Sequence, residues 1–183
     1  MFDGYGHVFR NPRSVVCFTA VFIEGIVVFG LFPYIAVMLE KRGAGGLKEA
    51  GLVLSGFAIG GLVYTALVRV LLSKLGLYNV IRAGAGLSGL GFIALSPEWS
   101  WPTEMALFVL IGAGFYMIHN SLQTQATELA PDARASAVAA HAFFFFLGQA
   151  MGPLIYGIGL ERFGTQTTLV SAGIAFVLMG LAT

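Results

Sequence analysis

Long apolar stretches alternate with short polar connections along the whole chain. A helix needs about 20 apolar residues to cross the hydrocarbon core of a bilayer. Five stretches meet or approach that length, and a sixth is cut short by the end of the sequence. The predicted spans cover residues 15–39, 51–72, 80–95, 105–122, 135–160 and 167–182.

Backbone polar groups inside a membrane must be paired within the protein, which leaves helices or closed barrels as the spanning structures. The alternating ten-residue strands of a barrel are absent from the sequence. The predicted fold class is therefore all-α, a polytopic transmembrane helix bundle with six spans. Residues 1–14 form a cytoplasmic N-terminal segment, and residues 15–183 form the bundle.

The connections set the expected orientation. Loop 96–104 carries Trp99 and Trp101, and tryptophan beside a span is typical of the membrane–water interface. Lys and Arg are enriched in cytoplasmic loops. With the N-terminus inside, six basic residues lie inside and four outside, a mild preference for this orientation. The inside set is Arg10, Arg13, Arg69, Lys74, Arg82 and Arg134, and the outside set is Lys41, Arg42, Lys48 and Arg162.

Composition supports lipid as the surrounding solvent. The 183 residues are 57% hydrophobic and 10% charged, whereas soluble domains are about 45–50% apolar and about 25% charged. A net charge of +1 gives no electrostatic case for binding nucleic acid. The single Cys17 offers neither a disulfide framework nor a zinc site.

Glu24 is the most conspicuous polar residue, because it lies near the middle of the first span. A carboxylate at the bilayer centre costs roughly 3 kcal/mol on insertion scales. It must therefore face a cavity, find a partner or bind a proton. Two interpretations stay open. Glu24 has a coupling or substrate role, or it is a protonated side chain that donates a hydrogen bond to a neighbouring helix.

Further polar residues lie on the fourth and fifth spans. Those of the fourth recur at steps of three and four, so they share one helical face, and a polar face in a membrane helix normally looks into the bundle or a cavity. The alternative is interhelical hydrogen bonding without a ligand, and for the histidine of the fifth span a packing role. The candidate pathway residues are Glu24, Tyr116, His119, Asn120 and Gln123, with His141 and Gln149 from the fifth span.

Small residues recur at the spacing of helix packing. Pairs four residues apart let helix backbones approach closely inside a membrane, although glycine is also simply common there. Proline inside a span removes a backbone donor and can bend the helix. These residues are Gly56 with Gly60, Gly84 with Ser88, Gly148 with Gly152, and the prolines Pro33 and Pro153.

No enzyme motif accompanies these features. Ser121 lacks the Gly-x-Ser-x-Gly elbow, and His119 and His141 lack the His-Glu-x-x-His spacing of a zinc site. The Gly84 and Gly86 pair has no strand–turn–helix context for a nucleotide. We therefore expect no enzyme activity, no cofactor and no metal.

Several motifs together resemble the major facilitator superfamily. One run is Gly112-Ala-Gly, Asn120, Glu128-Leu-Ala-Pro131-Asp-Ala-Arg134, and then Gly148-x-x-x-Gly152-Pro153-x-x-x-Gly157. It resembles the family's tenth span, the loop that follows and the eleventh span. Leu71, Lys74 and Gly76 resemble the cytoplasmic Gly-x-Leu-x-Asp-Arg-x-Gly loop between the eighth and ninth spans. Arg69 replaces its first glycine and Ser73 its aspartate, which puts any gating salt bridge of that aspartate in doubt.

The resemblance covers nearly the whole chain, as family spans seven to twelve. It implies a C-terminal six-helix half of a transporter of the drug and sugar efflux type, often proton-coupled. The implied partners are the lipid bilayer, a small-molecule substrate and a missing N-terminal six-helix half, and the implied location is a bacterial inner (plasma) membrane. The alternative is a non-transporting membrane subunit or truncated remnant, inactive without its N-terminal half.

Overall fold

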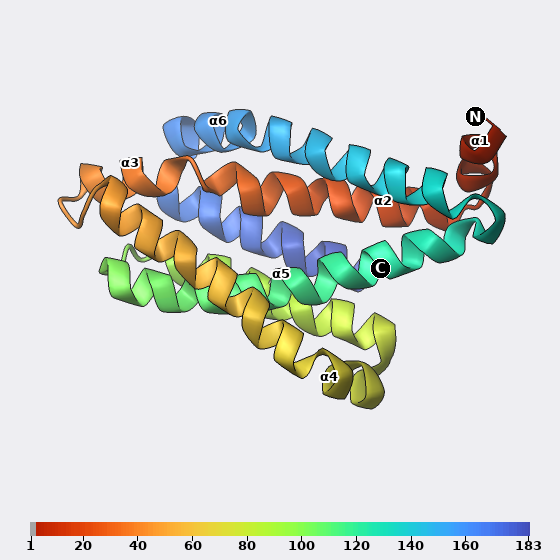
Figure 1. The fold of residues 1–183 in the computed structure, drawn as a ribbon. Helices are drawn as coiled ribbons and strands as arrows, with labels where there is room; N and C mark the ends of the chain where they lie inside the picture. Colours follow the sequence, from red (N-terminus) through yellow and green to blue (C-terminus); the bar gives the residue numbers. More distant parts are fainter. Residues whose placement is uncertain (1–2) are drawn as a thin grey trace.

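The computed structural model describes residues 3–183, and over these residues it is built from helices without strands. The first half holds α1 (Asp3–Arg10), α2 (Arg13–Glu24), a π-helical turn η1 (Gly25–Phe29), α3 (Tyr34–Lys41) and α4 (Leu47–Leu95). The second half holds α5 (Trp101–Leu129), a 3-10 turn η2 (Pro131–Ala133) and α6 (Arg134–Ala182). The long helices run side by side, and α1 lies at one end of the bundle, across its long axis (Figure 1).

Two of the helices double back on themselves at a glycine. Gly76 in α4 has φ 72° and ψ 168°, and Gly164 in α6 has φ 77° and ψ 171°. Residues with a Cβ rarely adopt such positive φ values, whereas glycine does so at no steric cost. The ribbon reverses direction within α4 and within α6 (Figure 1). These reversals fall inside the predicted connections between residues 72 and 80 and between residues 160 and 167.

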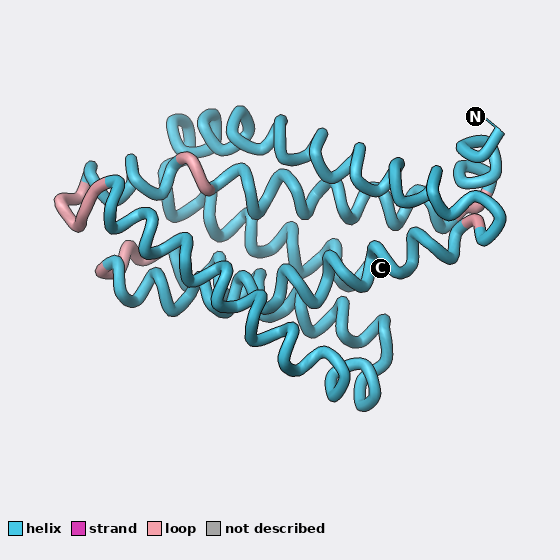
Figure 2. The backbone as a smooth tube through the Cα atoms, viewed as in Figure 1, coloured by secondary structure: helices cyan, strands magenta, loops and turns pink. Residues whose placement is uncertain are grey.

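Four helices are long and apolar enough to cross a membrane, judged by length and composition. They are Arg13–Lys41, Leu47–Leu95, Trp101–Leu129 and Pro131–Ala182. The second and fourth of these, with 49 and 52 residues, are the ones that reverse. Loops are confined to the ends of the bundle, apart from a break between η1 and α3 (Figure 2). That break falls at Pro33, where the sequence predicts a bend.

Glycines lie where the helices approach most closely. On α4, Gly56 lies against the backbone of Met105 and Gly60 against that of Val109, both on α5. On α6, Gly148 lies against Phe22 and Gly152 against Gly30. A Cβ at any of these four positions would collide with backbone atoms, so both predicted pairs occupy tight helix contacts. The third pair meets α5 as well, where Ser88 Oγ donates to the carbonyl of Ile111 at 2.8 Å.

Candidate functional site

Glu24 ends α2 with its side chain wholly enclosed by protein, at 0% exposure. Its Oε2 lies 2.9 Å from Nδ1 of His119 on α5, within hydrogen-bond distance. The other carboxyl oxygen, Oε1, is buried without a partner among the described residues. Two candidates from different predicted spans, 95 residues apart in sequence, therefore form one carboxyl–imidazole pair.

Aromatic rings enclose this pair. The His119 ring stacks on Phe115, with centroids 5.2 Å apart and an interplanar angle of 17°, and lies 4.7 Å from Phe145 of α6. His141, also on α6, meets His119 edge to face at 5.1 Å. His141 is 1% exposed, and its Nε2 has no partner in the described part of the chain. Of the two side chains of the pair, Glu24 is fully enclosed and His119 is 19% exposed.

Three other residues on the same predicted face of α5, Gly112, Tyr116 and Asn120, contact different neighbours. Gly112 lies against the Phe57 carbonyl of α4, and Tyr116 covers Gly61 of the same helix. Asn120 lines a different cavity, of about 310 Å³, together with Tyr64. The predicted polar face is thus divided between several neighbours.

The remaining two candidates differ in their exposure. Gln123 is exposed, and Gln149 is half-buried on α6. Their assignment to a pathway stays a prediction.

The predicted loop motif coincides with the reversal of α4. Gly76 forms the turn itself, Leu71 is half-buried and Lys74 is exposed. Within residues 3–183, Lys74 takes part in no ion pair. Ser73, at the position of the family's aspartate, donates to the Val70 carbonyl of its own helix at 3.0 Å.

Several polar contacts were not predicted from the sequence. Arg42 and Glu104 form a largely buried ion pair between the loop after α3 and the start of α5. Tyr34 donates to the Pro153 carbonyl at 2.7 Å, and Tyr156 donates to the Val27 carbonyl at 2.8 Å. Each contact joins elements more than 60 residues apart, so a local pattern carries no signal for it.

Taken together, the fold and the pair define a class: an apolar helix bundle of several long helices with a carboxyl–imidazole pair in its interior. The Major Facilitator Superfamily model matches residues 17–183, and the chain belongs to this superfamily of transporters. It is 32% identical over 139 residues to the uncharacterized MFS-type transporter YfkF of Bacillus subtilis (strain 168). That match covers 74% of this chain and 34% of YfkF, so the matched part spans about a third of that relative.

Proposed function

We propose that residues 1–183 act as one six-helix half of a secondary transporter. A second half would face it, and rocking of the two halves would alternate access to a small-molecule site between them. The reversals at Gly76 and Gly164 support six spans, because each divides a helix of about twice the membrane thickness in two. Membership of the superfamily supports transport as the function.

We further propose that the Glu24–His119 pair couples transport to protons. The observation that carries this is a carboxyl group with 0% exposure, bonded to an imidazole, in an apolar helix. An ionisable side chain inside a membrane is costly and usually marks a pathway for ions or protons. A carboxyl and an imidazole can exchange a proton across one hydrogen bond. Proton-driven efflux across a bacterial plasma membrane is the mode that the sequence resemblance implies.

Labelling of Glu24 with the hydrophobic reagent dicyclohexylcarbodiimide tests the coupling role. The reagent partitions into lipid and attacks protonated carboxyl groups. The purified chain in lipid nanodiscs would be treated over a pH series, and the labelled residue located by peptide mass spectrometry. We expect labelling of Glu24 that declines as pH rises, because the carboxyl group must release its proton in the working range. The exposed carboxyl groups of Glu40 and Glu128 serve as internal controls and should remain unlabelled at neutral pH.

Two outcomes would count against the proposal. Labelling of Glu24 that stays constant across the pH range would mean that the group never releases its proton, as expected for a packing role. If Glu24 stays unlabelled at acidic pH, both in the unmodified chain and in the His119→Phe variant, protons do not reach the site. Glu24→Gln, which cannot react, fixes the background.

A further inference from the structure

The helix that carries Glu24 continues directly into a π turn. In a π turn each N–H bonds to the carbonyl five residues back instead of four, and such turns are rare and often lie at functional sites. Here the turn comprises Gly25–Phe29, and a glycine lies at each edge of it. Gly25 lies against the backbone of Phe145, Gly148 and Gln149 of α6, and Gly30 lies against Gly152 of the same helix.

The spacing of these contacts fits a π turn. The two glycines of α6 are four residues apart, about one turn of an α-helix, so they share one face. Their partners Gly25 and Gly30 are five residues apart. In an α-helix five residues rotate about 140° beyond a full turn, which would point one of the two glycines away from α6. A π turn brings residues five apart onto the same face.

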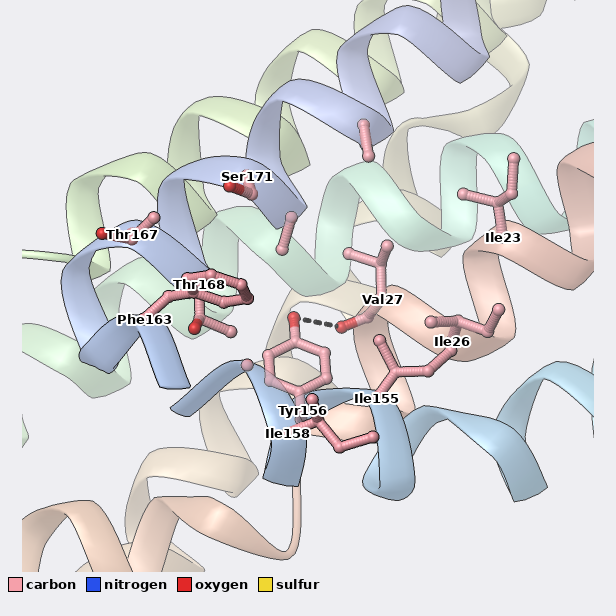
Figure 3. A pocket seen from close by; sticks show the side chains of 13 residues that line it. Ile23, Ile26, Val27, Ile155, Tyr156, Ile158, Phe163, Thr167, Thr168 and Ser171 are labelled. Carbon is pink, nitrogen blue, oxygen red and sulfur yellow. Dashed lines mark hydrogen bonds between the residues drawn. The ribbon is translucent and has the colours of Figure 1, made fainter. Parts of the chain in front are cut away.

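One side chain from α6 bonds inside this turn. Tyr156 is buried at 2% exposure, and its hydroxyl donates to the Val27 carbonyl at 2.8 Å (Figure 3). An apolar cavity of about 540 Å³ lies next to it, with Ile23 and Ile26 on one side and Ser171 on the other (Figure 3). The turn therefore has room on this side to change its shape, and the Tyr156 hydrogen bond opposes such a change.

We propose that Tyr156 is a positioning residue that holds the π turn, and that the turn keeps Glu24 facing His119. Relaxation of the turn to α geometry, with Gly30 held on Gly152, would rotate the preceding helix by about 100°. That rotation would take the Glu24 carboxyl away from His119 and out of its sealed site. The proposal rests on the proposed role of Glu24, since a sealed proton carrier must reach water by some movement.

Accessibility of position 24 tests this directly. Glu24→Cys would be made in a Cys17→Ala background, and its rate of reaction with N-ethylmaleimide measured for the full chain in lipid nanodiscs. Adding Tyr156→Phe should raise that rate about tenfold, the factor that corresponds to about 1.4 kcal/mol. This lies in the range of about 1–3 kcal/mol for leaving a buried polar group unpaired. The matched control is Tyr34→Phe, which removes a hydrogen bond between α3 and α6, beyond the turn.

A deletion provides a rescue. Without Val28, Gly25 and Gly30 are four residues apart, like the two glycines of α6, so an α-helical turn holds both contacts without help from Tyr156. Adding the Val28 deletion to Tyr156→Phe should therefore return the rate at position 24 to its slow value. General loosening of the bundle is monitored with Ser88→Cys, a buried position on α4 whose rate should stay slow throughout.

The results separate this proposal from the coupling role of Glu24. A tenfold rise confined to Tyr156→Phe and reversed by the deletion supports the positioning role. An unchanged rate, an equal rise with Tyr34→Phe, or a rise that the deletion does not reverse would overturn it. The maleimide rates do not depend on protonation of Glu24, because position 24 is a cysteine in these variants. The carbodiimide labelling does depend on it. Failure of either proposal is therefore visible without failure of the other.

Discussion

Replacing both members of the Glu24–His119 pair should harm stability less than replacing either one. The two side chains share one hydrogen bond across 2.9 Å, inside a shell formed by Phe115, Phe145 and His141. Glu24→Met replaces the carboxyl group with an apolar side chain of similar length. His119→Phe retains a ring to pack against Phe115 and removes both nitrogens. Each single variant leaves the other polar group buried without its partner, and the double variant leaves neither.

The magnitudes follow from the cost of unpaired groups. A buried donor or acceptor that loses its partner costs about 1–3 kcal/mol, and more if it is charged, whereas exchanging both partners for apolar groups is nearly neutral. The cost of leaving Glu24 unpaired lies at the upper end of this range because its exposure is zero. The cost of leaving His119 unpaired is lower because 19% of its side chain is exposed. We expect about 2–3 kcal/mol lost in His119→Phe, which strands the carboxyl, and about 1–2 kcal/mol in Glu24→Met. The double variant should regain at least about 1 kcal/mol relative to His119→Phe.

The assay is reversible unfolding of the purified chain in mixed micelles, followed by the helical circular dichroism signal as the denaturing detergent fraction increases. Ser88→Ala supplies the control, because it removes a buried hydrogen bond to Ile111 that shares no partner with the pair. When Ser88→Ala is combined with Glu24→Met, the two losses of stability should add to within about 0.5 kcal/mol. Additive losses in the Glu24→Met and His119→Phe double variant would refute the pairing, and with it the site on which the proposed function depends.

Three further predictions concern topology, packing and activity. Ser73→Cys and Ser100→Cys, each in a Cys17→Ala background, should react with an impermeant maleimide from opposite sides of the membrane, and reaction from the same side would contradict six spans. Gly148→Leu should destabilise the bundle by about 1–3 kcal/mol through overpacking against α2, measured as above, whereas Gly86→Leu, which meets no atom within 4 Å, should cost far less. Reconstituted alone in liposomes, residues 1–183 should give solute flux at the background rate, and saturable uptake would contradict the half-transporter proposal.

Hydropathy predicted the architecture well because membrane helices need no partner to satisfy their backbone. The all-helical fold is confirmed, and both reversals lie in predicted connections. The helices continue closer to the turning residues than predicted, since glycine at positions 76 and 164 reverses the chain within a single residue. The segment before the first span was predicted only as a cytoplasmic tail, yet it contains α1. Directly after that helix, Asn11 Nδ2 donates to the Leu129 carbonyl at the end of α5 at 3.0 Å.

The candidate site was predictable one residue at a time, and its pairing was not. The depth of Glu24 in an apolar span marks it as unusual whatever it contacts, and the polar stripe marks His119 in the same way. Their contact depends on how α2 and α5 are rotated, and neither helix carries that information alone. The π turn was missed for the same reason. It accompanies a mismatch between the five-residue spacing of Gly25 and Gly30 and the four-residue spacing of Gly148 and Gly152, which becomes visible only when the two segments are seen to touch.

The two faces of α2 are held to their neighbours by different kinds of interaction. Toward α6, Gly25 and Gly30 allow direct backbone contact, and the side-chain bond inside the turn is a neutral one from Tyr156. Toward α5, the polar contacts are a weak bond from Cys17 Sγ to the Leu122 carbonyl and the Glu24–His119 pair, and the strength of the pair depends on where its protons lie. Contacts of the first kind are indifferent to protonation, because no titrating carboxyl or imidazole takes part in them. A change in protonation of the pair therefore acts first on the contact between α2 and α5.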